Sequence, residues 1–144
     1  MDFAPIKKLQ GTAADLLVAS KLVSRGFSVS WPVGDSAPYD LIADSRGKVS
    51  RVQIKSCCKK RSGTYHVGFR FGIDGKRIKY TDKEVDFFVV VISYSNGPGF
   101  YIIPINELKS SQARFWAPGE HHYNTPRWRL CAYEEFRDRW ELLR

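Results

Sequence analysis

Apolar residues recur at helical spacing over the first part of the chain, from Pro5 to Ser24. One apolar face is marked by Leu9, Ala13, Leu16, Leu17, Ser20 and Val23. A second stripe of small or apolar residues surrounds Asp15 at offsets of three, four and seven positions: Gly11, Thr12, Val18, Ala19 and Leu22. The pattern predicts a helix over this range, and Gly26 is placed as the residue after its end.

Two strand-like runs follow a short strand expected near Phe27 to Trp31. They are Tyr39 to Asp44 and Val49 to Lys55, joined by Ser45-Arg46-Gly47-Lys48. If the turn centres on Arg46-Gly47, counting outwards pairs Asp40 with Gln53. Lys55 lies two residues beyond Gln53 and therefore on the same face, because side chains alternate along a strand. The pattern predicts an acid, an amide and an amine on one patch of sheet.

The second half of the chain continues this mixed pattern. Asp74-Gly75 between aromatic-rich flanks predicts a hairpin within 64–80, and Thr81-Asp82-Lys83-Glu84 predicts a capped helical turn. The runs 86–92 and 100–105 predict strands, the first of them fully buried. We further expect a helix from Asn106 towards Ala113, irregular chain over 115–129, and an amphipathic helix over 133–143.

These elements predict an α/β (α+β) fold with helices against a central mixed sheet. The strands on either side of Arg46-Gly47 are joined too tightly for a parallel crossover, which excludes a doubly wound dinucleotide fold. The length of 144 residues suits a single domain over 1–144, and the sequence contains no internal repeat or linker.

Charge and cysteine content narrow the function. The formal net charge of +8 favours a polyanionic partner, and no apolar run approaches the roughly 20 residues that span a bilayer. The first residues do not resemble a signal peptide. Cys57, Cys58 and Cys131 are odd in number and form no C-x-x-C pair, so we expect a reduced, cytoplasmic protein without membrane contact.

Each residue of the polar patch also has a structural interpretation. Asp40 could serve only as a strand-entry turn residue, Gln53 as a satisfied strand amide, and Lys55 as an edge lysine that discourages aggregation. Asp15 could be a solvated acid at the margin of its helix. A lysine inside a sheet is costly unless paired, however, so the geometry of the group favours a functional site.

The motifs of residues 11–56 carry a family resemblance. Gly11-x-x-x-Asp15, Gly26-Phe27, Pro32-x-Gly34-Asp35-Ser36-x-Pro38-Tyr39-Asp40 and Val52-Gln53-Ile54-Lys55-Ser56 resemble the PD-(D/E)xK nuclease superfamily. The chain is most similar to the intron-encoded homing endonucleases, and the archaeal Holliday junction resolvases are similar in layout. The resemblance covers about 7–105 and leaves 106–144 as a C-terminal extension. It implies a restriction-endonuclease-like core, with a central mixed sheet flanked by helices and an inserted β-hairpin.

The resemblance also implies roles for individual residues. The first-helix acid of the family falls on Asp15, and the Asp of its PD motif falls on Asp40 after Tyr39 rather than Pro. Its (D/E)xK motif falls on Gln53-Ile54-Lys55, with Gln in place of the acid. Asp40, Gln53 and Asp15 would hold Mg²⁺, for which Mn²⁺ substitutes, and Lys55 would act on the attacking water or on the phosphate.

Two basic segments accompany this group and suggest how DNA is held. Lys59, Lys60 and Arg61 follow the strand of Lys55. Arg70, Lys76, Arg77 and Lys79 lie on the expected hairpin, whose first arm would also carry His66 and Phe69. A two-stranded ribbon fits a major groove, where basic side chains reach bases and phosphates.

The leading interpretation is a Mg²⁺-dependent, sequence-specific double-stranded DNA endonuclease of homing type. It would act as a homo-oligomer, either a dimer or a tetramer, because cutting both strands needs two active sites. Two alternatives stay open at this point. One is a structure-specific nuclease such as a Holliday junction resolvase, and the other is a degenerate, non-enzymatic DNA-binding protein.

Overall fold

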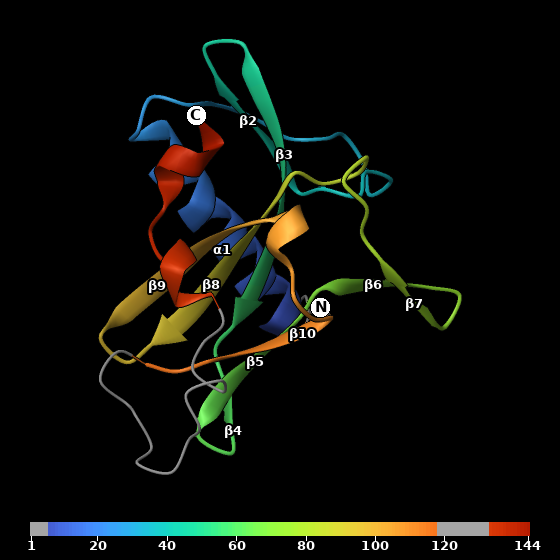
Figure 1. Cartoon of the computed structure of the whole chain (residues 1–144), viewed down its shortest axis with the longest axis vertical. Coiled ribbons are helices and arrows are strands. Elements are labelled where there is room, and N and C mark those ends of the chain that lie inside the picture. Colours follow the sequence, from blue (N-terminus) through green and yellow to red (C-terminus); the bar gives the residue numbers. More distant parts are fainter. Residues whose placement is uncertain (1–5, 118–132) are drawn as a thin grey trace, which may run out of the picture.

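A five-stranded mixed sheet forms the centre of the molecule, with one long helix packed on one of its faces (Figure 1). The computed structural model describes residues 6–117 and 133–144. Its elements are α1 (Ile6–Val23), β1 (Ser28–Ser30), β2 (Leu41–Ser45), β3 (Lys48–Cys57), β4 (Lys60–Arg61), β5 (Thr64–Gly68), β6 (Arg70–Ile73), β7 (Lys76–Lys79), β8 (Phe87–Tyr94), β9 (Gly97–Pro104), η1 (Ile105–Glu107), β10 (Gln112–Phe115), η3 (Glu134–Phe136) and η4 (Trp140–Leu143).

The β2–β3 hairpin has the register that its sequence predicts. Leu41 lies opposite Val52, which places Asp40 opposite Gln53. The turn is set by Arg46 and Gly47, both with positive φ, at 53° and 93°. The Gly47 amide donates a 2.8 Å hydrogen bond to the Asp44 carboxylate, which closes the turn. A shift of one residue here would move Gln53 and Lys55 to the other face of the sheet.

The sheet order is β1-β2-β3-β8-β9, with β3 and β8 parallel and the other neighbours antiparallel. Strand β8, between β3 and β9, is the buried strand expected from 86–92, and all but its first and seventh residues are buried. Strand β9 likewise confirms the strand expected over 100–105. The chain between β3 and β8 makes the parallel crossover, and it consists of strands rather than a helix.

The two faces of the sheet carry separate cores. On the α1 face, Ala14, Val18 and Leu22 pack against strand residues such as Val52 and Val89. The opposite face is covered by a three-stranded sheet of order β10-β5-β4, where the sequence suggested helices. The core of that second face is formed by Tyr65, Val67, Phe69, Val85, Phe88, Val90, Ile92, Tyr94, Tyr101, Ile103, Ala113, Phe115 and Tyr133.

Two helices expected in the C-terminal part are absent from the described residues. The segment from Asn106 to Ala113 forms the 3-10 turn η1 and then enters β10, because Ala113 and Phe115 alternate inward against β5. The segment 133–143 forms two 3-10 turns instead of an amphipathic helix. Asp138 separates these turns with a φ of 52° and donates its amide to the Phe100 carbonyl, 2.9 Å away.

Residues from the C-terminal part nevertheless complete both cores. Trp140 and Leu143 are buried on the α1 face, and Tyr133 is buried on the opposite face. The expected irregular segment 115–129 lies mostly outside the described residues, as does Cys131. Cys57 and Cys58 are free thiols. The described part of the chain contains no helix that is long and apolar enough to cross a membrane.

The hairpin β6–β7 turns at Asp74-Gly75 as expected and projects from the body of the molecule (Figure 1). Its arms are shorter than the sequence suggests. His66 lies in β5, opposite Arg114 of β10, and Phe69 is buried against Phe88. Neither His66 nor Phe69 therefore belongs to the hairpin, because the second core draws the chain before Arg70 onto the sheet.

Gly99 lies so close to the Tyr94 ring that adding a single methyl group at this position should destabilise the fold. A Cβ atom on Gly99 would lie 2.4 Å from the Tyr94 ring. This ring cannot move aside freely, because it is buried, packs edge-to-face with the Tyr65 ring and shares a 2.7 Å hydrogen bond with the Tyr101 hydroxyl. We expect Gly99→Ala to lower the free energy of unfolding by about 1–3 kcal/mol, measured by urea denaturation. Gly68→Ala is the control, since nothing lies within 4 Å of its Cβ position, and an equal loss in both variants would contradict the packing explanation.

Candidate active site

An opening in the sheet lies where β2 and β3 part. Strand β3 is paired with β2 only from Lys48 to Val52, whereas its pairing with β8 continues to Cys57. From Gln53 onward, one side of β3 is therefore free of a neighbouring strand. Asp40 stands at the start of β2 and directs its carboxylate into this opening, where it meets the backbone and side chains of β3.

Asp40 is held by two hydrogen bonds to the same oxygen. The Ile54 amide donates to Asp40 Oδ2 at 2.7 Å, and Gln53 Nε2 donates to it at 2.5 Å. Burial raises the pKa of Asp40 above its usual value, while the Ile54 amide, the Lys55 charge and the Gln53 amide act in the opposite direction. The carboxylate is thus fixed in position, but burial still disfavours its charged form. A nearby cation would stabilise that charged form.

Asp15 brings a second carboxylate to the site from α1. It is partly buried on the flank of the helix beside the sheet-facing residues Ala14 and Val18. Burial raises the pKa of Asp15 to about 6, and the nearby charge of Asp40 contributes to this rise. The fold therefore brings Asp15 within electrostatic range of Asp40, although the two residues lie far apart in the sequence.

Lys55 lies beside Asp40 and contacts an aromatic residue that the sequence did not indicate as part of the site. Its Nζ donates a 3.2 Å hydrogen bond to the Tyr80 hydroxyl and lies 5.2 Å from the centre of the same ring. Burial lowers the pKa of Lys55, and the charge of Asp40 opposes that shift. Burial raises the pKa of Tyr80 to about 12, so its hydroxyl stays neutral and can accept this bond at ordinary pH.

Tyr80 is itself fixed by neighbouring rings. Its ring centre lies 4.7 Å from that of Phe71 on the hairpin and 5.2 Å from that of Phe88 in β8. The sequence signal for this residue was indirect: a tyrosine between a basic hairpin and a capping box. Only the packing of Tyr80 against β8 shows that its hydroxyl reaches Lys55.

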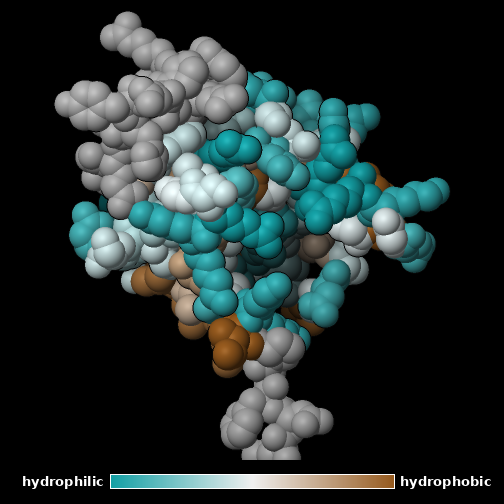
Figure 2. Space-filling model, turned by 90° about the horizontal axis from the view of Figure 1, so that it is seen from below, coloured by the Kyte–Doolittle hydropathy of each residue, from teal (hydrophilic) through white to brown (hydrophobic). Residues whose placement is uncertain are grey.

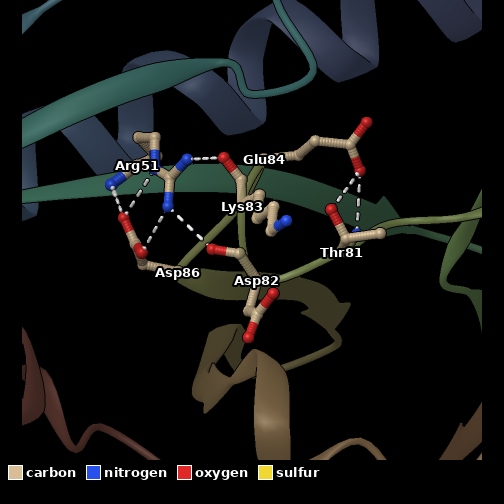
Figure 3. A network of polar contacts seen from close by, with 6 residues as sticks. All are labelled: Arg51, Thr81, Asp82, Lys83, Glu84 and Asp86. Carbon is tan, nitrogen blue, oxygen red and sulfur yellow. Dashed lines mark hydrogen bonds and ion pairs between the residues drawn. The ribbon is translucent and has the colours of Figure 1, made fainter.

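A polar network anchors the segment that follows Tyr80 (Figure 3). Arg51 of β3 makes a two-point contact with Asp86, at 3.0 Å and 2.8 Å, and its guanidinium also donates to the carbonyls of Asp82 and Lys83. The Arg51 guanidinium holds the pKa of Asp86 below its usual value. These bonds tie the turn 81–86 to β3, two strand positions before Gln53.

The expected capping box within this turn is also present. The Glu84 carboxylate accepts hydrogen bonds from the Thr81 amide at 2.8 Å and the Thr81 hydroxyl at 2.9 Å (Figure 3). The Val85 amide donates to the Thr81 carbonyl, which completes one helical turn. Together with Arg51, this turn fixes the backbone directly after Tyr80 and so supports the contact between Tyr80 and Lys55.

The donor atoms of this site suit a hard divalent cation that keeps several waters. Mg²⁺ in proteins is commonly held by one or two carboxylates together with water, and Asp40 and Asp15 are such a pair. Among residues 6–117 and 133–144, no cluster of three or more His, Cys, Asp or Glu side chains is placed to bind a metal. The site thus offers only two negative charges to a metal ion, those of Asp40 and Asp15. The neutral amide oxygen of Gln53 is the additional donor beside Asp40.

The basic residues expected at the DNA surface lie in two places. Lys59, Lys60 and Arg61 are exposed just beyond β3, where Lys59 and Arg61 border a groove of about 860 Å³ between α1 and β4. Figure 2 looks towards this end of the molecule. The other group lies on the β6–β7 hairpin and is also exposed: Arg70, Lys76, Arg77 and Lys79.

The pairing of β6 with β7 sorts the hairpin residues by face. Arg70 lies opposite Lys79, and Arg77 lies opposite Gly72, so these three cations share one face. Lys76 lies opposite Ile73 and shares the other face with Phe71 and Ile78. The hairpin thus has a basic face and a mainly apolar one, a distinction that requires the observed strand register.

Comparison with known proteins identifies the family of this chain. The family described as PD-(D/E)XK endonuclease matches residues 6–130 of the chain. Protein 5.3 of Escherichia phage T7 is 32% identical over 87 residues, which cover 60% of this chain and 73% of that protein.

Two solved structures are similar in fold. A bacterial homing endonuclease, I-Ssp6803I, superposes with a TM-score of 0.77 at 25% identity, over 94% of this chain and 91% of that chain. The structure of MepB superposes with a TM-score of 0.50 at 12% identity, over 76% of this chain and 85% of that chain, and supports the fold alone.

The raised pKa of Asp15 predicts a specific pH dependence of stability. In metal-free protein, between about pH 4 and 6, the folded state retains a proton that the unfolded state has lost, so stability falls as pH rises through this window. Asp15→Asn should remove that fall and be more stable than wild type at pH 7 by about 1 kcal/mol, a value reduced for the partial exposure of the carboxyl. Below pH 4 the difference should shrink.

Urea unfolding in the presence of EDTA, from pH 4 to 7, measures this difference. Asp35→Asn, in the exposed loop before β2, is the matched control for the loss of one carboxyl group. A stability difference between wild type and Asp15→Asn that does not vary with pH would show that the Asp15 carboxyl is not perturbed by its surroundings.

Proposed function

Because the chain belongs to the PD-(D/E)XK endonuclease family, we propose that this nuclease is a Mg²⁺-dependent enzyme that cuts double-stranded DNA at a specific sequence, as homing endonucleases do. The observation that carries the proposal is the meeting of Asp40, Gln53 and Lys55 at the opening between β2 and β3. Asp15 adds a carboxyl whose pKa is raised by burial and by Asp40, and perturbed groups of this kind gather at catalytic sites.

The first part of the proposal concerns binding of the metal. Asp40 and Asp15 are its charged ligands, and Gln53 contributes its amide oxygen while its nitrogen side steadies Asp40. When bound there, Mg²⁺ supplies charge neutralisation at the phosphate and a more acidic water. Because Gln53 is neutral, Asp15 carries more of the metal affinity than a site with three acidic residues would require.

The second part concerns Lys55. Its ammonium lies within electrostatic range of Asp40, where it can stabilise the negative charge that develops on the phosphate or orient the attacking water. Tyr80 restricts the motion of Lys55 through a hydrogen bond and the face of its ring. A preorganised cation of this kind loses little freedom when the reaction proceeds.

The third part concerns the substrate. The basic face of the hairpin, with Arg70, Arg77 and Lys79, is exposed on a ribbon that projects from the body, and the ribbon is joined to the site through Tyr80. A two-stranded ribbon can enter a major groove, where arginine and lysine recognise guanine and contact phosphates. Lys59, Lys60 and Arg61 extend the positive surface beyond β3 and would hold the phosphate backbone.

A specific observation favours the homing type over a junction-resolving nuclease. The structural likeness to I-Ssp6803I, a bacterial homing endonuclease, extends over nearly the whole of both chains. We infer that this chain likewise acts on an extended duplex site as a homo-oligomer. A symmetric assembly supplies two active sites, one for each strand.

Loss of Lys55 or Asp40 should abolish hydrolysis while leaving DNA binding intact. We expect Lys55→Ala and Asp40→Ala to reduce Mg²⁺-dependent or Mn²⁺-dependent plasmid nicking by about 100-fold or more, because each removes an electrostatic contribution made at the reacting phosphate. Binding to the same DNA, measured in Ca²⁺ or EDTA, should change much less. Lys48→Ala is the matched control, a lysine at the distant hairpin end of the same strand. Full activity in either site variant would refute the assignment.

The two faces of the hairpin should differ in DNA binding. Arg77→Ala/Lys79→Ala should weaken binding to duplex DNA and reduce the slope of log affinity against log salt by about 2, because each substitution takes one cation away from the phosphate backbone. Lys76→Ala, on the opposite face, should have a much smaller effect. Fluorescence anisotropy over a salt series measures both quantities. Equal effects in the two variants would remove the distinction between the faces, and wild-type affinity in the double variant would remove the hairpin from the interface.

A further inference from the structure

The face of α1 that points away from the sheet is apolar and uncovered by any described residue. Ile6, Leu9, Leu16 and Val23 are 73%, 57%, 61% and 58% exposed. The residues buried against the sheet, Ala14, Val18 and Leu22, lie on the opposite side of the helix. The apolar face that the sequence marks is thus a different one from the face that builds the core.

This exposed stripe has the spacing of a helix-packing seam. Its positions alternate in steps of three and four residues over the whole helix: Ile6, Leu9, Ala13, Leu16, Ser20 and Val23. Such spacing keeps a narrow stripe facing a second helix over several turns. Figure 2 shows hydrophobic surface, in brown, at the lower edge of the molecule in that view, the side on which α1 lies.

Charge is excluded from the stripe. Between Lys8 and Lys21, the exposed residues of α1 are all uncharged. The three lysines of the helix, Lys7, Lys8 and Lys21, lie outside the stripe, near the helical positions of the sheet-facing residues Ala14 and Leu22. Depletion of charge is typical of a surface that is buried in an assembly, and it differs from the mixed charge of an ordinary solvated helix face.

The order of large and small side chains along the stripe indicates that its partner is the α1 helix of a second copy of this chain. If a second α1 lies antiparallel to the first about a two-fold axis, Ile6 meets Val23 of the second copy, and Leu9 meets Ser20. The central layers then pair Ala13 with Leu16. In these central layers a large side chain faces a small one, so the two helices can approach closely without voids. A parallel arrangement would instead place Leu against Leu and Ala against Ala, which leaves alternating crowded and empty layers.

We propose that two copies of this chain associate through α1, as an antiparallel helix pair in which Leu16 of each copy packs on Ala13 of the other. This inference deepens the homo-oligomer included in the proposed function, on which it rests, by assigning its surface. Asp15 lies on a flank of α1 outside the seam, so the pairing does not use the helix residue of the candidate active site. The pair would hold two active sites in a fixed symmetric relation.

The mass of the protein in solution tests the proposal. Wild type should sediment at twice the 16.5 kDa of one chain, or at a larger even multiple. Leu16→Lys should halve this mass at micromolar concentration, because the two-fold axis buries two new lysines against apolar partners and raises the dissociation constant by more than about 100-fold. Val49→Lys is the matched control, an apolar residue 55% exposed on the β2–β3 hairpin. It should leave the mass unchanged.

An exchange of sizes tests the antiparallel register. Ala13→Leu crowds the central layers and Leu16→Ala empties them, so each should weaken association by at least about tenfold. The double variant Ala13→Leu/Leu16→Ala restores a large residue opposite a small one and should recover most of the affinity. Circular dichroism must show that each variant keeps its fold, which is expected because both positions face solvent in a single chain.

The results separate this proposal from the proposed catalytic function. Lys55→Ala should assemble as wild type does, whether or not it cuts DNA, because Lys55 lies on β3 and outside the α1 seam. A monomeric wild type, an unchanged mass in Leu16→Lys, or a double variant weaker than both single variants would overturn the α1 pairing. None of these outcomes bears on the nicking assay of Asp40 and Lys55.

Discussion

The arrangement of the site depends on the carboxylate of Asp40 and the two groups of β3 that bind it. The Ile54 amide would normally pair with a neighbouring strand, but the pairing of β2 with β3 stops at Val52, and Asp40 Oδ2 accepts the bond instead. Gln53 Nε2 completes the contact from the side chain. The acid therefore satisfies the backbone of β3 where β2 no longer pairs with it, and this same opening contains the candidate site.

Further hydrogen bonds around this contact hold other residues of the site in place. Arg51 and Asp86 tie the turn after Tyr80 to β3, and Tyr80 in turn holds Lys55. Burial then works against the charged forms of all three ionisable groups, raising the pKa of Asp15 and Asp40 and lowering that of Lys55. Two neighbouring carboxylates with raised pKa, one of them within range of the single amine Lys55, form a site that favours an added cation, which connects the fold to the proposed metal-dependent chemistry.

Helix α1 serves two surfaces with one sequence. Ala14, Val18 and Leu22 attach it to the sheet and so deliver Asp15 to the site. Its opposite stripe, from Ile6 to Val23, has the uncharged, size-alternating composition of an interface. A helix that is apolar on two sides lowers the solubility of a single chain, because one apolar side stays in contact with water. The proposed pairing of two copies would bury that side.

The sequence by itself determined the local features: α1, the β2–β3 register through Arg46-Gly47, the Asp74-Gly75 turn, the capping box and the buried strand β8. Each depends on spacing within a few residues or on a turn that only certain residues adopt. The family resemblance likewise predicts that Asp15, Asp40, Gln53 and Lys55 belong to one site, and this assignment stays a prediction. Only the tertiary structure decided which side of α1 is buried, that Tyr80 contacts Lys55, that β10 replaces an expected helix, and that η3 and η4 interrupt the C-terminal one. These outcomes depend on contacts between distant segments, such as Ala113 against β5 or Asp138 with Phe100, and such contacts outweigh the weak local preferences of a short segment.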